Sequence, residues 1–377
     1  MVYDVCFLLL QSVAHDARTL NLARTLTKNG QSVLLLGIGS GEDITRLASE
    51  GIGFVPILPP NVPQKLILRW LKFHAALVRH GRKYQAKTYC AEDVFTLPSA
   101  SMLASQFRAR LLYDSREIFS ALASNHSRLL RQKIISGLER HYVRKVHTIF
   151  TSGDLDSDYL ADYLDIPRPN VVMNVPPYSE TAPSDLFRVL YRIPHDYTIL
   201  LYQGWIAEGR GILSAVRALR YAPDIVLCLL GDGEYQSVVR RTAEEVGVAD
   251  RVYFCGKVPY DRLPQWTASA DIGLCFIEPV SLSYSFALPN KLFEYCMAGI
   301  PSLVSDLPAM RHVVERFPVG VLVSPDASPE EIAQMLYRLL EPASRAAFAA
   351  CRQAAAREYC WEHQEQTVLS IFSDKSR

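Results

Sequence analysis

Residues 198–234, TILLYQGWIAEGRGILSAVRALRYAPDIVLCLLGDGE, decide the fold class of this chain. Apolar runs predict strands over 197–203 and 225–231, and the residues between them predict a helix over 211–220. Continuous Val, Ile and Leu runs separated by helices are typical of parallel sheets that are buried on both faces. The segment therefore predicts a strand–helix–strand unit of an α/β fold.

The same alternation of strand and helix continues on both sides of this segment. In the first half, strands are expected over 3–10, 32–38, 53–58, 110–114, 148–152 and 170–174. In the second half, further strands are expected over 251–256, 271–276, 301–305 and 319–323. Further helices are expected over 17–29, 234–246, 289–298 and 329–341. This order favours two doubly wound, Rossmann-like domains over one long sheet.

The domain boundary is predicted in a proline-rich segment, residues 174–183, which suits neither helix nor strand. We expect an N-terminal domain at 1–176, a linker at 177–187 and a C-terminal domain at 188–357. A length of 377 residues agrees with two domains. Since ligands bind beyond the carboxyl ends of the strands in such folds, we expect the site in a cleft between the two domains.

Composition excludes several other classes of protein. The chain is 49% hydrophobic and 21% charged, which argues against a disordered or collagen-like protein. No apolar run approaches the roughly 20 residues of a membrane-spanning helix, and Asp4 interrupts any signal peptide. The eight cysteines stand singly and the histidines are scattered, so we expect reduced thiols, no metal site and a cytoplasmic protein.

Charge is divided unevenly along the chain. Residues 1–150 carry 20 Lys and Arg against 10 Asp and Glu (+10), whereas 151–377 carry 20 against 29 (−9). The stretch 64–87 holds seven basic residues, no acidic residue and an aromatic edge, and a second basic cluster lies at 128–145. A basic amphipathic helix favours either a surface that binds anionic lipid or a core-packed helix with a solvated basic face. Nucleic acid is a poorer explanation, because no binding motif accompanies the charge.

The strongest candidate for a ligand site is the turn that opens the helix at 289–298. Pro289 suits the first helical position, and the amides of Asn290, Lys291 and Leu292 would then point out of the helix N-terminus. Such an end binds anions and suits a diphosphate. Glu294 lies about one turn further on and could accept hydrogen bonds from two neighbouring hydroxyls, as in a ribose. A capped helix with no ligand is the alternative.

Other turns after predicted strands hold further candidate residues. Gly204 permits close backbone approach, and Arg210 could clamp a phosphate. The pair Gly231 and Gly233 is a weak signal by itself, because tight turns need glycine in any case. Lys257 and Val258 could meet a base and a phosphate, and His15 and Asp16 follow the first strand of the chain. Asp16 could equally be only the N-cap of the helix at 17–29.

Taken in order, these motifs resemble the retaining glycosyltransferases of family 4. The resemblance covers nearly the whole chain and is densest between residues 198 and 323. It rests on the segments Tyr202-Gln203-Gly204, Gly209-Arg210-Gly211, Gly231-Asp232-Gly233, Gly256-Lys257-Val258, Pro289-Asn290-Lys291-Leu292-Phe293-Glu294 and Gly299-Ile300-Pro301. Upstream, Tyr113-Asp114-Ser115-Arg116-Glu117 is similar to a late segment of the family's N-terminal domain. A Pro-Asn-Lys segment before the glutamate is similar to that of one subset of the family.

The resemblance implies the GT-B fold, in which two Rossmann-like domains face each other across a cleft. It implies that the C-terminal domain binds a UDP- or GDP-sugar and that the N-terminal domain binds the acceptor. By position, Glu294 matches the glutamate that binds the donor ribose, and Arg210 matches the cation that holds the diphosphate. The segment Gly256-Lys257-Val258 matches the part that faces the base. The tail, at about 358–377, matches a final helix that packs back on the first domain.

Three positions depart from the family pattern. Phe286 stands where the first glutamate of the Glu-x7-Glu motif is usual, so the identity of the donor sugar is open. Trp205 replaces the usual arginine after the strand glycine, which leaves one cation fewer for the phosphates. Arg116 stands where the Asp-x-His-Glu segment has histidine.

Together these observations predict a retaining, metal-independent glycosyltransferase that moves a sugar from a UDP- or GDP-sugar to a lipid-linked or saccharide acceptor in polysaccharide or glycolipid synthesis. The catalytic residues expected are Arg210, Lys291 and Glu294. The donor-binding residues expected are Gly204, Arg210, Gly231, Gly233, Lys257, Val258, Asn290, Lys291, Leu292 and Glu294. The residues expected on the acceptor or sugar side are His15, Asp16 and Arg116. The alternatives are a non-catalytic partner protein and a nucleotide-sugar epimerase or phosphorylase of the same fold.

Overall fold

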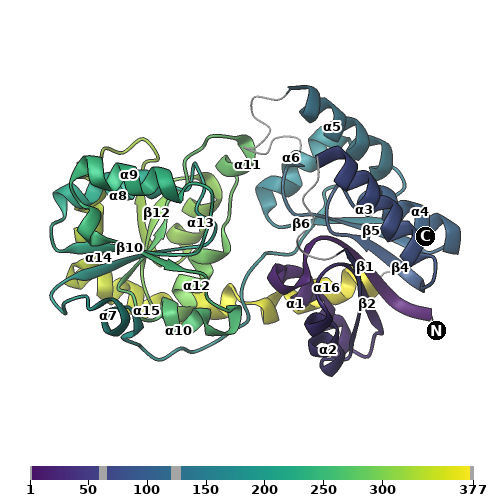
Figure 1. Ribbon diagram of the computed structural model, residues 1–377, viewed down its shortest axis with the longest axis horizontal. Helices are drawn as coiled ribbons and strands as arrows, with labels where there is room; N and C mark the ends of the chain where they lie inside the picture. Colours follow the sequence, from purple (N-terminus) through teal and green to yellow (C-terminus); the bar gives the residue numbers. More distant parts are fainter. Residues whose placement is uncertain (1, 59–65, 120–128, 374–377) are drawn as a thin grey trace. The chain divides into compact units, whose positions relative to one another are not determined.

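The protein consists of two compact units (Figure 1). This computed structural model describes residues 2–58, 66–119 and 129–373. Unit 1 comprises residues 1–173 and 364–377, and unit 2 comprises residues 174–363. The last helix, α16 (Trp361–Ser373), therefore begins in unit 2, and its residues from Gln364 onward belong to unit 1.

Unit 1 is built on a seven-stranded parallel sheet with the order β3-β2-β1-β4-β5-β6-β7. Its strands are β1 (Val2–Ser12), β2 (Val33–Ile38), β3 (Ile52–Leu58), β4 (Gln85–Ala91), β5 (Arg110–Ser115), β6 (Thr148–Thr151) and β7 (Asn170–Val171). The order reverses between β1 and β4, which are neighbours although 72 residues separate the end of β1 from the start of β4 along the chain.

Helices cover both faces of the unit 1 sheet. The helices of this unit are α1 (Ala17–Lys28), α2 (Gly41–Ser49), α3 (Leu66–Gly81), α4 (Leu97–Phe107), α5 (Leu129–Val143) and α6 (Asp154–Leu164). Cys6 and Leu8 of β1 share one core cluster with α3, α4 and α5. Phe7 points to the other face, where its ring lies 5.6 Å from that of Phe372 in α16.

Unit 2 repeats the topology with six parallel strands in the order β10-β9-β8-β11-β12-β13. They are β8 (Thr198–Gln203), β9 (Ile225–Leu230), β10 (Val252–Gly256), β11 (Ile272–Cys275), β12 (Ser302–Ser305) and β13 (Gly320–Val323). The order reverses here between β8 and β11. All six strands confirm the expectations from the sequence to within two residues at each end.

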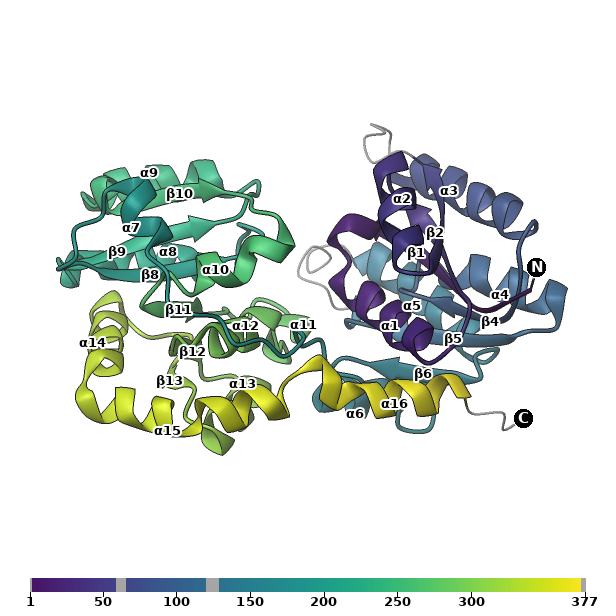
Figure 2. The same ribbon diagram turned by 90° about the horizontal axis from the view of Figure 1, so that it is seen from below.

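Two helical layers enclose this second sheet (Figure 2). On one face, α8 (Ile212–Ala218), α9 (Gln236–Val246) and α14 (Pro329–Leu340) share one core. The other helices are α7 (Leu186–Tyr191), α10 (Leu263–Thr267), α11 (Leu282–Ser285), α12 (Asn290–Ala298), α13 (Pro308–Arg316) and α15 (Pro342–Glu358). Helix α12 packs on the face opposite α8, where the Tyr295 ring fills the space that a Cβ at Gly273 would occupy. This packing fixes α12 against the middle of the sheet.

One strand was missed from the sequence, and one predicted helix is too long. Strand β4 reads QAKTYCA, and its exposed, polar start made it look like a continuation of the basic stretch 64–87. Helix α3 ends at Gly81, so Lys87 lies on β4 instead, where its Nζ is 2.8 Å from Asp4 Oδ1. The aromatic edge expected for a lipid surface also faces inward, because Phe73 is buried and Trp70 Nε1 donates to the Phe95 carbonyl at 3.1 Å.

Among the described residues, no helix combines the length and the apolar character that crossing a membrane requires.

Candidate functional site

Each sheet reverses its strand order once, and polar residues gather at both reversal points. In doubly wound sheets, ligands bind beyond the carboxyl ends of the strands at such a point. In unit 2 the reversal lies between β8 and β11, next to the start of α12. In unit 1 it lies between β1 and β4, next to Asp16 and Glu92.

The start of α12 differs by one residue from the prediction. The helix begins at Asn290, and Pro289 is its N-cap in an extended conformation, not its first residue. The amide of Leu292 donates to the Pro289 carbonyl at 3.1 Å, so it is committed within the turn. Of the three amides expected to meet an anion, those of Asn290 and Lys291 are left for this role.

Lys291 is a buried cation at this helix end, and among the described residues it has no hydrogen-bond or ion-pair partner, although the charge of Glu294 acts on it. Its side chain is 8% exposed, and Nζ finds no hydrogen-bond acceptor in the described part of the chain. Nζ lies 3.6 Å from the centre of the Tyr202 ring. Burial, together with the nearby charge of Arg210, lowers the pKa of Lys291 to about 7. An unpaired buried ammonium is costly, and an anionic ligand would relieve that cost.

Glu294 faces the end of β8 from the second turn of α12. Its Oε2 accepts a hydrogen bond from Gln203 Nε2 at 2.5 Å, and Gln203 Oε1 in turn accepts one from Thr267 Oγ1 at 2.8 Å. Burial raises the pKa of Glu294 above its usual value. The carboxylate is thus held in place by β8 and α10, and it keeps acceptor capacity for hydroxyls.

The predicted glycines have two different roles. A Cβ at Gly231 would lie 1.9 Å from the Gly204 carbonyl oxygen, and one at Gly233 would lie 2.1 Å from that of Ile206. These two glycines are therefore needed for the close packing of the β8 and β9 turns. At Gly204 a Cβ would meet nothing within 4 Å, but the φ of 124° favours glycine.

The other predicted donor residues lie at the rim of the same sheet edge. The Arg210 guanidinium lies over the Tyr284 ring, 4.6 Å from its centre. Lys257 is exposed and its Nζ lies 3.3 Å from Asp232 Oδ2, while Val258 beside it is half-buried. The two cations follow different strands, and both are partly open to solvent.

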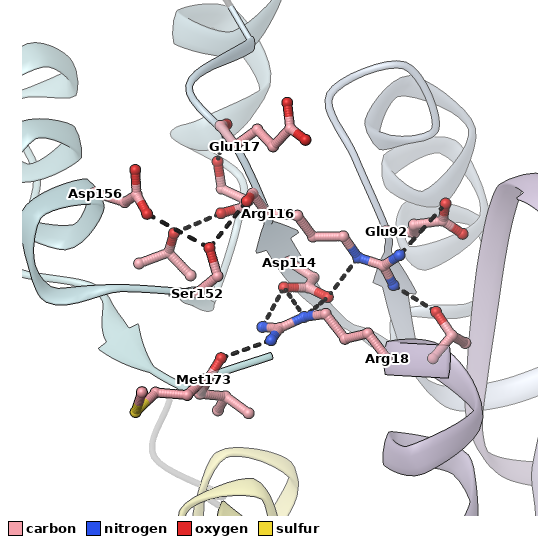
Figure 3. Close-up of polar contacts among 12 residues, drawn as sticks. Arg18, Glu92, Asp114, Arg116, Glu117, Ser152, Asp156 and Met173 are labelled. Carbon is pink, nitrogen blue, oxygen red and sulfur yellow. Dashed lines mark hydrogen bonds and ion pairs between the residues drawn. The ribbon is translucent and has the colours of Figure 1, made fainter. Parts of the chain in front are cut away.

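Unit 1 contains a buried network of charges centred on Arg116 (Figure 3). Its Nη1 lies 2.9 Å from Asp16 Oδ1 and its Nε 2.9 Å from Asp114 Oδ2. Arg116 Nη2 also donates to Thr19 Oγ1. Asp16 accepts from the Thr19 amide at 3.0 Å, so it is the N-cap of α1 as well as a partner of Arg116. The structure therefore brings Asp16 and Arg116 together, whereas the side chain of His15 lies outside the described part.

A second arginine completes the pairing of this network. Arg18 Nε and Nη2 donate to Asp114 at 2.9 and 2.8 Å, and Nη1 donates to the Val172 carbonyl at 2.6 Å. Both arginines thus share Asp114 and fix the ends of β5 and β7 against α1. Arg18 is not among the site residues predicted from the sequence.

Two acidic residues that directly follow β4, Glu92 and Asp93, are also absent from the site residues predicted from the sequence. Glu92 is 1% exposed, and neither of its carboxyl oxygens has a hydrogen-bond partner among the residues described. The nearest cation, Arg116 Nη1, lies 3.6 Å away, and burial together with Asp16 raises the pKa of Glu92 well above its usual value. Burial raises the pKa of Asp93 to about 6. Two acids after a strand would have been a signal, had that strand been recognised.

A third carboxyl lies near the end of β6. Asp156 Oδ2 is 3.4 Å from Ser152 Oγ, which donates to the Arg116 carbonyl at 2.9 Å (Figure 3). Burial raises the pKa of Asp156 to about 7. In the described ranges, no three His, Cys, Asp or Glu side chains are grouped so that they could hold a metal ion.

The architecture is that of the GT-B fold, with two Rossmann-like α/β units, and solved structures share it. Sucrose-phosphate synthase from Thermosynechococcus elongatus superposes with a TM-score of 0.81 at 17% identity and covers 98% of both chains. Anabaena HepE, in complex with UDP and glucose, gives a TM-score of 0.76 at 17% identity and covers 99% of this chain and 100% of its own.

The family comparison concerns unit 2. Residues 201–342, which run from the last half of β8 to just beyond α14, match the family described as Glycosyl transferases group 1. A curated relative, D-inositol 3-phosphate glycosyltransferase from Acidothermus cellulolyticus, is 27% identical over 225 residues, or 55% of this chain and 49% of that protein. The chain thus spans about half the length, or less, of the first curated relatives that it matches.

Proposed function

We propose that this protein is a retaining glycosyltransferase that moves a sugar from a UDP- or GDP-sugar to a lipid-linked or saccharide acceptor. Its product would be a cell-surface polysaccharide or a glycolipid. The observation that supports this proposal most is Lys291, a buried cation without a partner among the described residues, at the start of a helix within the family-matched segment. A helix N-terminus with an unpaired cation is suited to a diphosphate.

The donor is proposed to bind with its diphosphate against Lys291, Arg210 and the amide of Asn290. Glu294 would accept hydrogen bonds from the two ribose hydroxyls. When the bond between the anomeric carbon and the phosphate oxygen breaks, the oxygen keeps the electron pair. The cations and the helix end stabilise the charge that develops there, and the proposal needs no metal for this step.

Retention would follow from attack on the same face from which the diphosphate departs. The acceptor hydroxyl then bonds to the anomeric carbon, and its proton passes to an oxygen of the departing phosphate. We assign the acceptor to unit 1, at the end of β1 and β4, where Asp16 and Arg116 lie. Because these two side chains already pair with each other at 2.9 Å, they would act by shaping the site.

A peripheral position on the inner face of the cell membrane forms part of the proposal for a lipid-linked acceptor. On α5, Leu130 and Ile134 lie one helical turn apart and are 74% and 63% exposed. Exposed basic residues accompany them, namely Lys72 and Arg79 on α3, Lys133 and Arg140 on α5, and Arg144 directly after α5. Exposed apolar residues beside cations suit anionic lipid. Flotation with anionic vesicles at low salt tests membrane binding. The double variant Leu130→Asn, Ile134→Asn should reduce the fraction of protein that floats with the vesicles.

Calorimetry with UDP and GDP tests the donor site directly. We expect one of them to bind, and Glu294→Ala to weaken that binding through the loss of the ribose contacts. Absence of heat with both nucleotides would contradict the proposal. Product analysis separates the remaining alternatives: an epimerase changes the donor without an acceptor, and a non-catalytic partner binds it without turnover.

A further inference from the structure

Trp205 is an exposed aromatic residue at the carboxyl end of β8. It directly follows Gly204 and is 54% exposed, although tryptophan is the largest apolar side chain. The resemblance gives it no role, since a cation is usual at its position. Its surroundings in unit 2 suggest that it binds part of a ligand.

The structure holds this indole rigidly. Nε1 donates to Glu234 Oε2 at 2.8 Å, and the Trp205 carbonyl accepts from Tyr202 Oη at 2.6 Å. The backbone on both sides pairs with the β9 turn, through Gly204 N to Leu230 O at 3.0 Å and Ile206 N to Asp232 O at 2.8 Å. A ring that is already fixed loses little entropy when a ligand binds to it.

Trp205 is also continuous with the charged residues at the start of α12. The Tyr202 ring lies under Lys291 Nζ at 3.6 Å, and Gln203 donates to Glu294 at 2.5 Å. A single segment of four residues, 202–205, therefore contacts both charged groups and ends in the exposed indole. From the other side, Lys257 Nζ lies 5.2 Å from the centre of the Trp205 ring.

We propose that Trp205 stacks on the base of the nucleoside diphosphate whose phosphates lie against Lys291. This inference rests on the proposed function and assigns the base to a named side chain. The one N–H of the indole is already paired with Glu234, so the ring offers its π-face and not a hydrogen bond. The base is the planar, π-bearing part of such a ligand, and stacking does not depend on which base it is. Because Lys257 covers one face, the base is expected on the other.

The test measures how three ligands, namely UDP, GDP and inorganic pyrophosphate, bind to the full chain. Trp205→Ala should weaken binding of the preferred nucleotide roughly 5- to 150-fold. It should leave pyrophosphate binding unchanged, because pyrophosphate has no base. Trp205→Phe should restore most of the affinity, since it keeps an aromatic face. The matched control is Tyr221→Ala, which removes an exposed aromatic residue of unit 2 from the short 3-10 turn (Leu219–Tyr221) between α8 and β9.

Fluorescence provides a second readout. The chain has four tryptophans, and nucleotide binding should quench a component that is absent from Trp205→Phe. Unchanged nucleotide affinity in Trp205→Ala, or equal loss of pyrophosphate affinity, would overturn the stacking role and leave the donor site intact. If the wild-type chain bound neither nucleotide, the proposed function would fail and this inference with it.

Discussion

The two units place opposite charges at the same point of the same topology. At the reversal point of unit 1, buried acids outnumber the cations: Arg116 and Arg18 face Asp16, Asp114 and Glu92. At that of unit 2, Lys291 is buried without a hydrogen-bond or ion-pair partner among the described residues. Yet residues 1–150 are basic overall (+10) and residues 151–377 are acidic (−9). Net charge along a sequence therefore does not predict the charge of a buried site.

The buried charges of the two units also differ in whether they pair with one another. In unit 1, most charges pair with one another, and burial raises the pKa of the surplus carboxyl, Glu92, well above its usual value. Such a network holds strands and helices together without a ligand. In unit 2, Lys291 has no such partner among the described residues, and the proposed function pairs it with a diphosphate. Each of the following predictions changes one charge and asks whether stability or ligand binding responds.

The largest expected effect is on stability, from Arg116→Met. The substitution leaves Asp16 and Asp114 without one of their partners in a buried site, which costs about 3–5 kcal/mol in the free energy of unfolding. Hydrogen exchange with peptide resolution should locate the loss to unit 1. Arg210→Met is the control, with a loss of about 1 kcal/mol from its contact with Tyr284. Equal losses in the free energy of unfolding of Arg116→Met and Arg210→Met would contradict the view that the arginine of unit 1 is structural and that of unit 2 is not.

Lys291→Met should have the opposite profile. Replacing an unpaired buried amine by an apolar chain of similar length should leave stability unchanged or raise it. Nucleotide and pyrophosphate affinity should both fall about 10- to 100-fold, because a charged hydrogen bond to phosphate is lost. Urea denaturation measures the stability of the variant, and calorimetry on the same preparation measures its affinity for nucleotide and pyrophosphate. A strongly destabilised variant would mean that Lys291 is structural.

The affinity for the nucleotide should depend on pH through Lys291. Its pKa in the free protein is lowered to about 7, and a bound diphosphate favours the charged form and so raises this pKa. Affinity should therefore be highest below pH 7 and fall as the pH rises above it, with proton uptake on binding near pH 8. Comparing wild type with Lys291→Met removes the titration of the nucleotide itself. The same slope in both chains would contradict the assignment.

The smallest effect is expected from Glu92→Gln. The carboxyl, which faces Asp16, Asp93 and Arg116, has a raised pKa, so folding favours its protonated form. Wild-type stability should fall as the pH rises from the unfolded-state pKa towards the folded one, and Glu92→Gln should lack this part of the slope. At pH 5 the two chains should differ by less than about 1 kcal/mol. Urea midpoints at pH 5, 7 and 9 measure the stability difference between the two chains. A large loss of stability in Glu92→Gln at pH 5 would show that Glu92 is ionised in the folded wild type.

Much of the fold could be predicted from the sequence because its signals are local. The six strands of unit 2 and helix 290–298 follow from apolar runs and from helical spacing. Strand β4 could not be recognised in this way. Its polar start, with Gln85 and Lys87, follows a basic helix directly, and only pairing with β1 and β5 makes its second half a buried strand.

The site divides in the same way. The sequence by itself determined, to within one residue, that a helix opens at Pro289 and that Lys291 and Glu294 lie on its first two turns, since these features depend on neighbours in the chain. Only the tertiary structure decided that Lys291 is buried over Tyr202, that Arg116 pairs with Asp16, and that Glu92 lies beside both. Burial and pairing depend on residues 24 to 100 positions apart, which parallel strand order brings together, and they set the pKa of each group.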